Sequence, residues 1–242
     1  MKDNSQMRFQ VKLEELGVSL NEMQLEQLQR YYEMLIERGK VMNLTTITDL
    51  NEVQEKHFID SLAIIKIVEM KENLHIIDVG TGAGFPGIPI KIAFPQVNVV
   101  LLDSLNKRVR FLEEVIDDLG LSGIKAIHGR AEDVAKKPEY REKFDVSVSR
   151  AVANLSTLSE YCLPFVGVGG SFISYKSGDV YDEIETAQGA VNKLGGEIEE
   201  ILIFQLPKTD IQRSLVKMKK IKATPLKYPR KAGLPGKEPL VE

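Results

Sequence analysis

Three glycines at alternate positions follow an acidic residue within residues 75–90, HIIDVGTGAGFPGIPI. The acidic residue is Asp78, and the glycines are Gly80, Gly82 and Gly84. The apolar residues before Asp78 predict a strand, and those after the glycines predict the start of a helix. Glycine is needed because a tight turn visits backbone angles that a Cβ forbids, and because the backbone must approach a ligand closely. The pattern is typical of the turn at which parallel α/β sheets bind nucleotide-like ligands.

The residue types in this turn distinguish between classes of ligand. Gly82-x-Gly84-x-x-Gly87 matches the dinucleotide pattern G-x-G-x-x-G, in which a helix N-terminus binds the pyrophosphate. Asp78, at the carboxyl end of the predicted strand, would repel that group. S-adenosylmethionine carries a sulfonium and an ammonium but no phosphate, so the same carboxylate attracts it. The pattern therefore favours S-adenosylmethionine over NAD, and a glycine turn that binds nothing is the third alternative.

Two further predicted strand ends could complete a nucleoside site. Asp103 ends an apolar run at 97–103, and an acid there can accept both hydroxyls of a ribose. Its alternative role is in capping the following helix, although Ser104 could do this instead. The turn after the next predicted strand contains Ala131 and Glu132 and would border the adenine ring. An exposed acidic turn that contacts no ligand is the alternative there.

Arg150 follows the predicted strand at 144–149, beside the place where a methyl group would be presented. Its guanidinium could bind a phosphate or stack on a base, and an ion pair with a neighbouring carboxylate is the alternative. We assign no catalytic residue, and Arg150 is the nearest candidate. Methylation at guanine N7 fits this absence, because N7 has a free lone pair and the reaction requires mainly placement.

Two residues that could act as nucleophile or base have other interpretations. Cys162 lies in a predicted helix without basic neighbours, so we interpret it as a core residue and not as the thiolate of a cytosine-C5 methylase. His57 is interpreted as a packed or half-exposed helix residue. The chain also has no Asn/Asp-Pro-Pro-aromatic motif of the kind that amino-group methylases use.

The composition limits the class of protein. The chain has 242 residues, one cysteine and three histidines. This length supports a core without disulfides, and the single cysteine argues against a disulfide framework or a structural zinc site. The polar N-terminus has no apolar signal region, and no apolar run is long enough to span a membrane. We therefore expect a cytoplasmic protein that binds no metal and no membrane. We also expect a monomer, since nothing in the sequence indicates an obligate dimer.

A basic segment lies near the C-terminus. Residues 211–237 contain nine Lys and Arg residues and no acid, although the net charge of the whole chain is −3. A basic segment on an acidic body is typical of a surface that binds a polyanion, and a solvated strand face with a tail is the alternative. The candidate RNA-binding residues are Arg213, Lys217, Lys219, Lys220, Lys222, Lys227, Arg230 and Lys231.

Hydrophobic periodicity predicts the elements that position these residues. Residues 1–72 show helical spacing and predict a cap, with one helix after a capping box at Ser19-x-x-Glu22 and another over 50–69. Alternation of strands and helices then predicts a parallel doubly wound sheet. The predicted strands are 74–79, 97–103, 123–128, 144–149, 170–175, 198–206 and 214–221. The division is a helical cap at 1–72, a ligand-binding domain at 73–222 and a basic, Pro-rich irregular arm at 223–242.

Several long motifs in order resemble the RsmG (GidB) family from about residue 20 to the C-terminus. They are MNLTTI, KHFIDSL, DVGTGAGFPGIPI, LLDSLNKR, GRAED, SRAVANLSTLSEYCLP and YPRKAGLPGK. The resemblance implies a class I, Rossmann-like methyltransferase sheet, mostly parallel with an antiparallel C-terminal strand. It also implies S-adenosyl-L-methionine as the donor and N7 of a guanine in 16S rRNA of the small ribosomal subunit or its precursor as the acceptor. The cofactor contacts that it implies fall on Gly80, Phe85, Ala131, Glu132 and Arg150.

Overall fold

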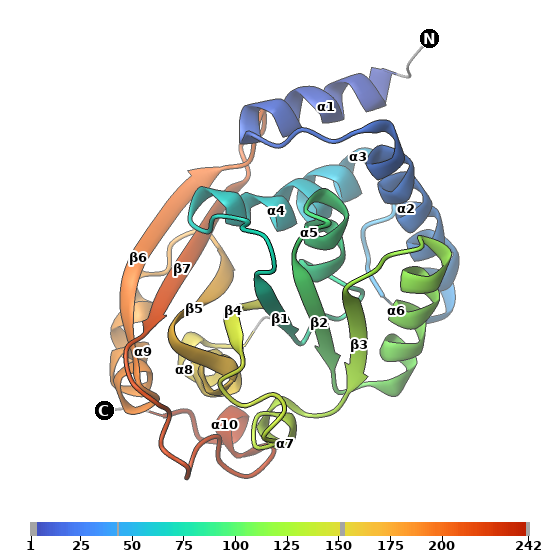
Figure 1. Cartoon of the computed structure of the whole chain (residues 1–242). Helices are drawn as coiled ribbons and strands as arrows, with labels where there is room; N and C mark the ends of the chain where they lie inside the picture. Colours follow the sequence, from blue (N-terminus) through green and yellow to red (C-terminus); the bar gives the residue numbers. More distant parts are fainter. Residues whose placement is uncertain (1–3, 43, 151–152, 241–242) are drawn as a thin grey trace.

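The computed structural model describes residues 4–42, 44–150 and 153–240. The strands form one sheet in the order β3-β2-β1-β4-β5-β7-β6 (Figure 1). The strands are β1 (His75–Val79), β2 (Asn98–Asp103), β3 (Ile124–His128), β4 (Phe144–Ser149), β5 (Val166–Ser177), β6 (Gly196–Gln205) and β7 (Gln212–Lys220). Strands β1 to β5 are parallel, whereas β7 is antiparallel to both β5 and β6. The predicted mostly parallel sheet with an antiparallel C-terminal strand is therefore confirmed.

Helices cover both faces of this sheet. Those before β4 are α1 (Asn4–Leu16), α2 (Glu22–Met42), α3 (Leu50–Val53), the π-helix η1 (Gln54–Ile59), α4 (Asp60–Leu62), the 3-10 helix η2 (Ala63–Lys66), α5 (Gly87–Ala93), α6 (Asn106–Asp118) and α7 (Ala131–Val134). Those after β4 are α8 (Leu155–Cys162), the 3-10 helix η3 (Leu163–Phe165), α9 (Tyr181–Lys193) and α10 (Leu234–Lys237). In Figure 1 the blue helix α2 lies beside α5 and α6, and α8 and α9 lie near β5 and β6.

Alternation along the strands divides the core into two clusters. Ile76 and Ile77 are consecutive and fully buried, but Ile76 belongs to one hydrophobic cluster and Ile77 to the other. Successive side chains of a strand point to opposite faces, so one cluster lies on each face of the sheet. The first cluster includes the apolar faces of α1 and α2. The second includes α8, α9 and Tyr228 of the C-terminal segment.

Two predictions about the N-terminal helices are wrong in detail. The capping box that begins α2 joins Asn21 and Gln24, since the side chain of each accepts the backbone N–H of the other. Glu22 is instead the first helical residue, so Ser19 and Glu22 are not the box. The helix predicted over 50–69 is divided into α3, η1, α4 and η2 and ends at Lys66.

The C-terminal segment is mostly irregular, as predicted, but it contains α10 and packs against the body of the protein. In the three described ranges, no helix is long and apolar enough to cross a bilayer. Across the same residues, no group of three or more His, Cys, Asp or Glu side chains could hold a metal ion. The division at 72/73 and 222/223 stays a prediction.

Candidate functional site

The glycine turn after β1 presents bare backbone to open space. Gly80, Gly82 and Gly84 have φ of 72°, 63° and 109°, a region that side chains with a Cβ rarely adopt. A Cβ built on Gly80 or Gly82 would meet nothing within 4 Å, whereas one on Gly84 would lie 2.7 Å from the Tyr31 hydroxyl. The first two glycines therefore leave room for a ligand, and the third allows close packing against α2.

Asp78 supports this turn from inside the protein. Its side chain is fully buried, and its Oδ2 accepts hydrogen bonds from Thr81 Oγ1 at 2.6 Å and from the Gly87 N–H at 2.8 Å. Its Oδ1 has no hydrogen-bond partner among the described residues. Burial raises the pKa of this carboxyl to about 7, although the hydrogen bonds from Thr81 and Gly87 oppose the shift. The geometry makes Asp78 a brace of the turn, and its predicted contact with the cofactor stays a prediction.

A cavity of about 340 Å³ lies at the carboxyl edge of the sheet. Its walls come from the ends of β1, β2 and β4, the turn after β3, α8 and the C-terminal segment. Three of the predicted cofactor-binding residues line it: Gly80, Ala131 and Glu132. Asp78, Gly82, Gly84, Phe85, Asp103 and Arg150 are not among its lining residues. In an open α/β sheet this edge is the position at which nucleotide-like ligands bind.

Asp103 connects the glycine turn to the next helix. Its Oδ2 accepts a hydrogen bond from the Gly82 N–H at 2.9 Å, and its Oδ1 accepts one from the Leu105 N–H at 2.8 Å. Arg108 Nη1 lies 3.4 Å from Oδ2. The carboxylate thus holds Leu105, the residue before α6, but α6 has no side-chain cap from Asp103 or from Ser104. The ribose contact of Asp103 stays a prediction.

Arg150, at the end of β4, joins the glycine turn to the N-terminal helices. Its Nη1 donates to Asp60 Oδ2 at 2.9 Å and to the Lys56 carbonyl at 3.0 Å, and its Nη2 lies 3.1 Å from His57 Nδ1. Its guanidinium carbon lies 4.9 Å from the centre of the Phe85 ring. The ion pair left open by the sequence is therefore formed, with Asp60 as the carboxylate.

A second cavity, of about 530 Å³, lies beside Arg150. Arg150, Lys176 and Arg213 line it together with Asp60, which accepts a hydrogen bond from Arg213 Nε at 3.0 Å. The complete lining is Ile47, Lys56, His57, Asp60, Arg150, Tyr175, Lys176, Ser177, Glu183 and Arg213. Ser149 lines the first cavity, whereas Arg150, the next residue, lines the second. The end of β4 therefore has a cavity on each side.

His57 is packed, as predicted, but it also lines the second cavity. Its ring stacks on Phe85 with 4.6 Å between ring centres, and its Nε2 lies 3.0 Å from Thr45 Oγ1. Burial, together with the nearby Arg150 guanidinium, lowers the pKa of His57 to about 3. A neutral ring is consistent with a packing role. Cys162 is fully buried, and burial raises the pKa of its thiol, so it is a core residue.

Sequence reasoning missed Asp60, Tyr175 and Lys176. Asp60 is 4% exposed although it is charged, and two arginines distant in the sequence satisfy it. In a helix over 50–69, Asp60 would lie about 200° around the axis from both Phe58 and Leu62, so the apolar spacing of that segment did not indicate its burial. Lys176 follows the buried Tyr175 at the end of β5 and pairs with Glu183 at 2.7 Å.

Several candidate RNA-binding residues are engaged inside the protein. The prediction for Lys220 is wrong, because its side chain is fully buried, with Nζ 2.7 Å from the Leu163 carbonyl and 3.2 Å from Glu142. Burial lowers the pKa of Lys220 to about 8. Arg213 is paired with Asp60, Lys217 with Glu199 and Arg230 with Glu160. Lys219 is half-buried, and Lys222, Lys227 and Lys231 are exposed.

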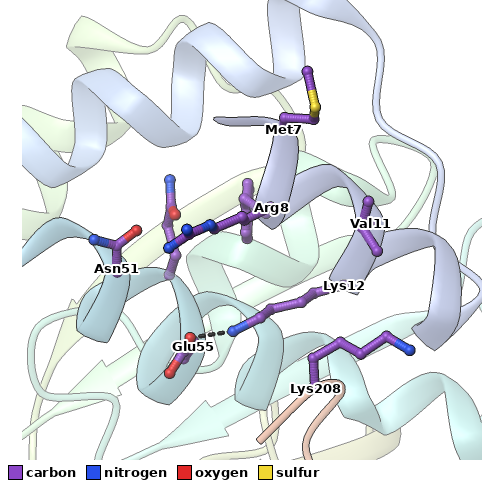
Figure 2. A pocket seen from close by; sticks show the side chains of 9 residues that line it. Met7, Arg8, Val11, Lys12, Asn51, Glu55 and Lys208 are labelled. Atoms are coloured by element: carbon purple, nitrogen blue, oxygen red, sulfur yellow. Dashed lines mark hydrogen bonds and ion pairs between the residues drawn. The ribbon is translucent and has the colours of Figure 1, made fainter. Parts of the chain in front are cut away.

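A third cavity, shown in Figure 2, is lined by other residues. It has a volume of about 550 Å³ and is lined by α1, the segment from Asn51 to Glu55, and Lys208 of the β6–β7 connection. Lys12 forms an ion pair with Glu55 across it (Figure 2). None of the predicted site residues lines it.

Known proteins match this sequence over its whole length. The GidB family, described as rRNA small subunit methyltransferase G, matches residues 24–216. The Ribosomal RNA small subunit methyltransferase G of Lachnoclostridium phytofermentans is 54% identical over 241 residues, 100% of this chain and 99% of that protein. The protein of the same name from Acetivibrio thermocellus is 54% identical over 224 residues, 93% of this chain and 92% of that protein.

A solved structure shares the fold at much lower identity. A SAM dependent methyltransferase from Aquifex aeolicus superposes with a TM-score of 0.52 at 18% identity, over 73% of this chain and 96% of that one. By the extent of the sequence match, the chain belongs to the GidB family of rRNA small subunit methyltransferase G proteins.

Proposed function

We propose that this protein transfers a methyl group from S-adenosyl-L-methionine to N7 of a guanine in 16S rRNA of the small ribosomal subunit or its precursor. The observation that carries the proposal is the pair of cavities at the end of β4, one beside Ser149 and one beside Arg150. The glycine-turn cavity is suited to the donor, and the cavity with several cations is suited to a nucleotide of RNA. The methyl group would pass between them, and the protein would act as a monomer in the cytoplasm, where ribosomes are assembled.

The first cavity fits S-adenosylmethionine. Gly80 lines the cavity and leaves open space where a Cβ would project, as Gly82 does in the same turn. Gly80, Ala131 and Glu132 line the cavity and would hold the cofactor. Asp103 supports the glycine turn through the Gly82 N–H, and its contact with the ribose stays a prediction. When bound, the cofactor supplies a methyl group on a sulfonium, which is electrophilic without help from a metal or a base. The protein therefore has to bind and orient the cofactor and to exclude water from the site.

The second cavity fits a guanine nucleotide whose N7 needs no deprotonation. Its arginine and lysine side chains can balance the charge of a phosphate, and Arg150 can also stack on a base. His57 is not required as a base, because the lone pair of N7 attacks directly. Asp60 fixes Arg150 and Arg213, so the two guanidinium groups are held in place before the RNA arrives. Placement of this kind can supply much of the rate enhancement of a two-substrate reaction.

The exposed lysines on the C-terminal side could extend the RNA contact. Lys222, Lys227 and Lys231 are exposed and belong to the segment without acids. Phosphate contacts of this kind provide sequence-independent affinity and make binding sensitive to salt. The guanine itself would be selected in the second cavity.

The test uses Lys176→Gln, which removes a charge from the second cavity but keeps a hydrogen-bond donor. We expect this variant to methylate 30S subunits more slowly and to retain wild-type affinity for S-adenosylhomocysteine in calorimetric titration. The control is Lys136→Gln, since Lys136 is exposed and lines neither cavity. Methylation by Lys176→Gln at the wild-type rate would contradict the assignment of the second cavity. Binding of NAD(H) in place of S-adenosylhomocysteine would contradict the donor.

A further inference from the structure

The C-terminal segment from Thr224 to Glu238 is held on the body of the protein by polar contacts to its backbone. Arg141 donates to the carbonyls of Thr224 at 2.8 Å and Tyr228 at 2.9 Å. The Thr224 N–H donates to Glu142 Oε1 at 2.7 Å. These contacts come from the loop between α7 and β4, and they place the segment beside α7 and α8. An arm that serves only to contact RNA would not need them.

A buried ion pair fixes the middle of this segment. The side chain of Glu160, on α8, is 1% exposed, and its Oε2 lies 2.7 Å from Arg230 Nη2. Its Oε1 also accepts a hydrogen bond from the Arg230 backbone N–H at 2.7 Å. Arg230 Nη2 donates in addition to the Glu238 carbonyl, which ties the end of the segment to its middle. One carboxylate therefore holds both the side chain and the backbone of residue 230.

The part of the segment just after Arg230 forms a wall of the first cavity. Gly233 lines that cavity, and its N–H donates to Glu132 Oε1 at 2.7 Å. Glu132 is 5% exposed and is one of the residues predicted to contact the cofactor. Thr157 Oγ1, on α8, donates to the Pro235 carbonyl at 3.0 Å, just beyond Gly233. The segment is thus anchored on both sides of the residue that faces the cavity.

We infer that the docked segment at residues 228–237 completes the cofactor cavity through Gly233, next to the predicted adenine site, with Arg230 and Thr157 as positioning residues that hold Gly233 against Glu132. This inference rests on the proposed function, because the ligand of the cavity is S-adenosylmethionine. Glu132 then has two roles. It lines the cavity, and its carboxylate accepts the hydrogen bond from the Gly233 N–H that holds the segment in place. The affinity for the cofactor therefore depends on the C-terminal segment, although the basic sequence of that segment, taken alone, indicates a contact with RNA.

Thermodynamic linkage between ligand binding and docking of the segment allows a test on the wild-type protein. If the docked segment completes the cavity, a ligand in the cavity must stabilise the docked segment by the same free energy. We expect S-adenosylhomocysteine to slow hydrogen–deuterium exchange in peptides covering residues 230–236. The control is the β6–β7 connection at 206–211, which contributes no residue to the cavity lining. Saturation with the ligand without any change at 230–236 would overturn the inference.

Variants test the same point without relying on activity. Arg230→Lys keeps the charge but loses part of the contact with Glu160, and Thr157→Val removes only the hydrogen bond to Pro235. We expect each to raise the Kd for S-adenosylhomocysteine at least threefold, measured by calorimetry without RNA. The affinity of cofactor-free Thr157→Val for 16S rRNA should stay at the wild-type value. The matched control is Leu226→Ala, because Leu226 lies in the same segment, is 88% exposed and lines neither cavity.

The outcomes separate this inference from the proposed function. If Arg230→Lys fails to fold, Thr157→Val carries the test, because it replaces one side chain by another of the same shape. If the folded variants bound S-adenosylhomocysteine with wild-type affinity, the inferred role of the segment in the cavity would be contradicted. The proposed function would still stand, because the wild-type protein binds the ligand. If the wild-type protein did not bind S-adenosylhomocysteine at all, the proposed function would fail, and this inference would fail with it.

Discussion

Arg150 and Asp60 are 90 residues apart in the sequence, yet Arg150 Nη1 lies 2.9 Å from Asp60 Oδ2. Asp60 also accepts a hydrogen bond from Arg213 Nε at 3.0 Å through its other oxygen. One buried carboxylate from the N-terminal helices therefore orients two arginines that come from β4 and β7. This arrangement connects the helical N-terminal part to the cavity proposed for the RNA, and it leads to the first prediction.

Asp60→Asn should slow methyl transfer while leaving cofactor affinity unchanged. The amide keeps the shape of the side chain but loses the charge that holds Arg150 and Arg213. Misplacement of reacting groups by about 1 Å can cost on the order of 100-fold in rate, so we expect a loss of that order in kcat. The measurements are kcat on 30S subunits and the Kd for S-adenosylhomocysteine. The control is Asp118→Asn, which removes the surface ion pair with Arg30. An unchanged kcat would show that Asp60 does not position these arginines for the reaction.

Gly82→Val should abolish cofactor binding and leave the affinity for RNA close to wild type. Gly82 has φ of 63°, and a side chain there would strain the turn that carries Gly80 and would project into the open space in front of that turn. Gly120 provides a matched control, because it has φ of 61° and also faces open space, but it lies at the end of α6. Gly120→Val should therefore lose stability without losing the cofactor. Equal affinity of the two variants for S-adenosylhomocysteine would contradict the placement of the cofactor.

The pH dependence of stability should change when Asp78 is replaced by asparagine. The pKa of Asp78 is raised in the folded protein to about 7, above its value of 3.8 in the unfolded chain. The folded state therefore keeps this proton longer, and the stabilising contribution is complete below pH 3.8 and is lost as the pH rises through 7. The largest slope for one such group is about 1.4 kcal/mol per pH unit.

Asp78→Asn removes this titration, and its amide oxygen can still accept from Thr81 and Gly87. The variant should thus gain stability relative to the wild type between pH 5 and pH 8, as measured by urea unfolding at both values. A constant difference between the two proteins at both pH values would disprove the assignment. S-adenosylhomocysteine affinity measured on the same variant separates the two roles of Asp78. A wild-type Kd would identify it as a brace of the turn, and a large loss would support direct attraction of the cofactor.

His57 should remain neutral across the range in which the enzyme works. Its pKa of about 3 lies below the ordinary value of 6.5, because burial and the nearby arginine disfavour the charged ring. A depressed pKa of this kind stabilises the folded protein above pH 6.5, and that contribution is lost as the pH falls from 6.5 towards 3. The ring resonances of His57 in an NMR titration should not shift between pH 5 and pH 8. A midpoint near 6.5 would mean that the ring is accessible and available as a base.

Lys220 and Lys222 should behave oppositely although they are two residues apart. Lys220→Met leaves Glu142 and the Leu163 carbonyl without their buried partner, so we expect a loss of about 2 kcal/mol in urea unfolding. The same variant should bind rRNA as the wild type does. Lys222→Met should keep its stability and reduce the slope of log K against log salt by about one, as expected for one lost phosphate contact. Weaker RNA binding by Lys220→Met at full stability would restore Lys220 as a contact residue.

The sheet was predictable because its signal is local. Apolar runs followed by Asp78 and Asp103 mark the ends of β1 and β2, and the glycines have the positive φ that the turn requires. The start of α2 was not predictable in the same way. Asn21-x-x-Gln24 and Ser19-x-x-Glu22 both fit a capping box, and the local pattern does not choose between them.

Site residues were predictable where they directly follow a predicted strand in the same segment of the sequence. Gly80, Ala131 and Glu132 line the first cavity because each follows a strand that the sequence identifies. The contacts of Asp60 join segments far apart, so no spacing reveals them. The sequence also indicates that Lys220 is buried, but a count of the charges in the basic segment does not use this indication. In β7 it shares its face with the buried Val216 and Met218, so the period of two predicts burial.

The most direct measurement is methyl transfer from labelled S-adenosylmethionine to 30S subunits and to naked 16S rRNA, both from a strain that lacks this protein, followed by identification of the modified nucleoside. The account predicts 7-methylguanosine at a single position of 16S rRNA, and the substrate that is methylated shows whether the particle is needed. Binding of the donor without transfer to either substrate, or a product other than 7-methylguanosine, would contradict it.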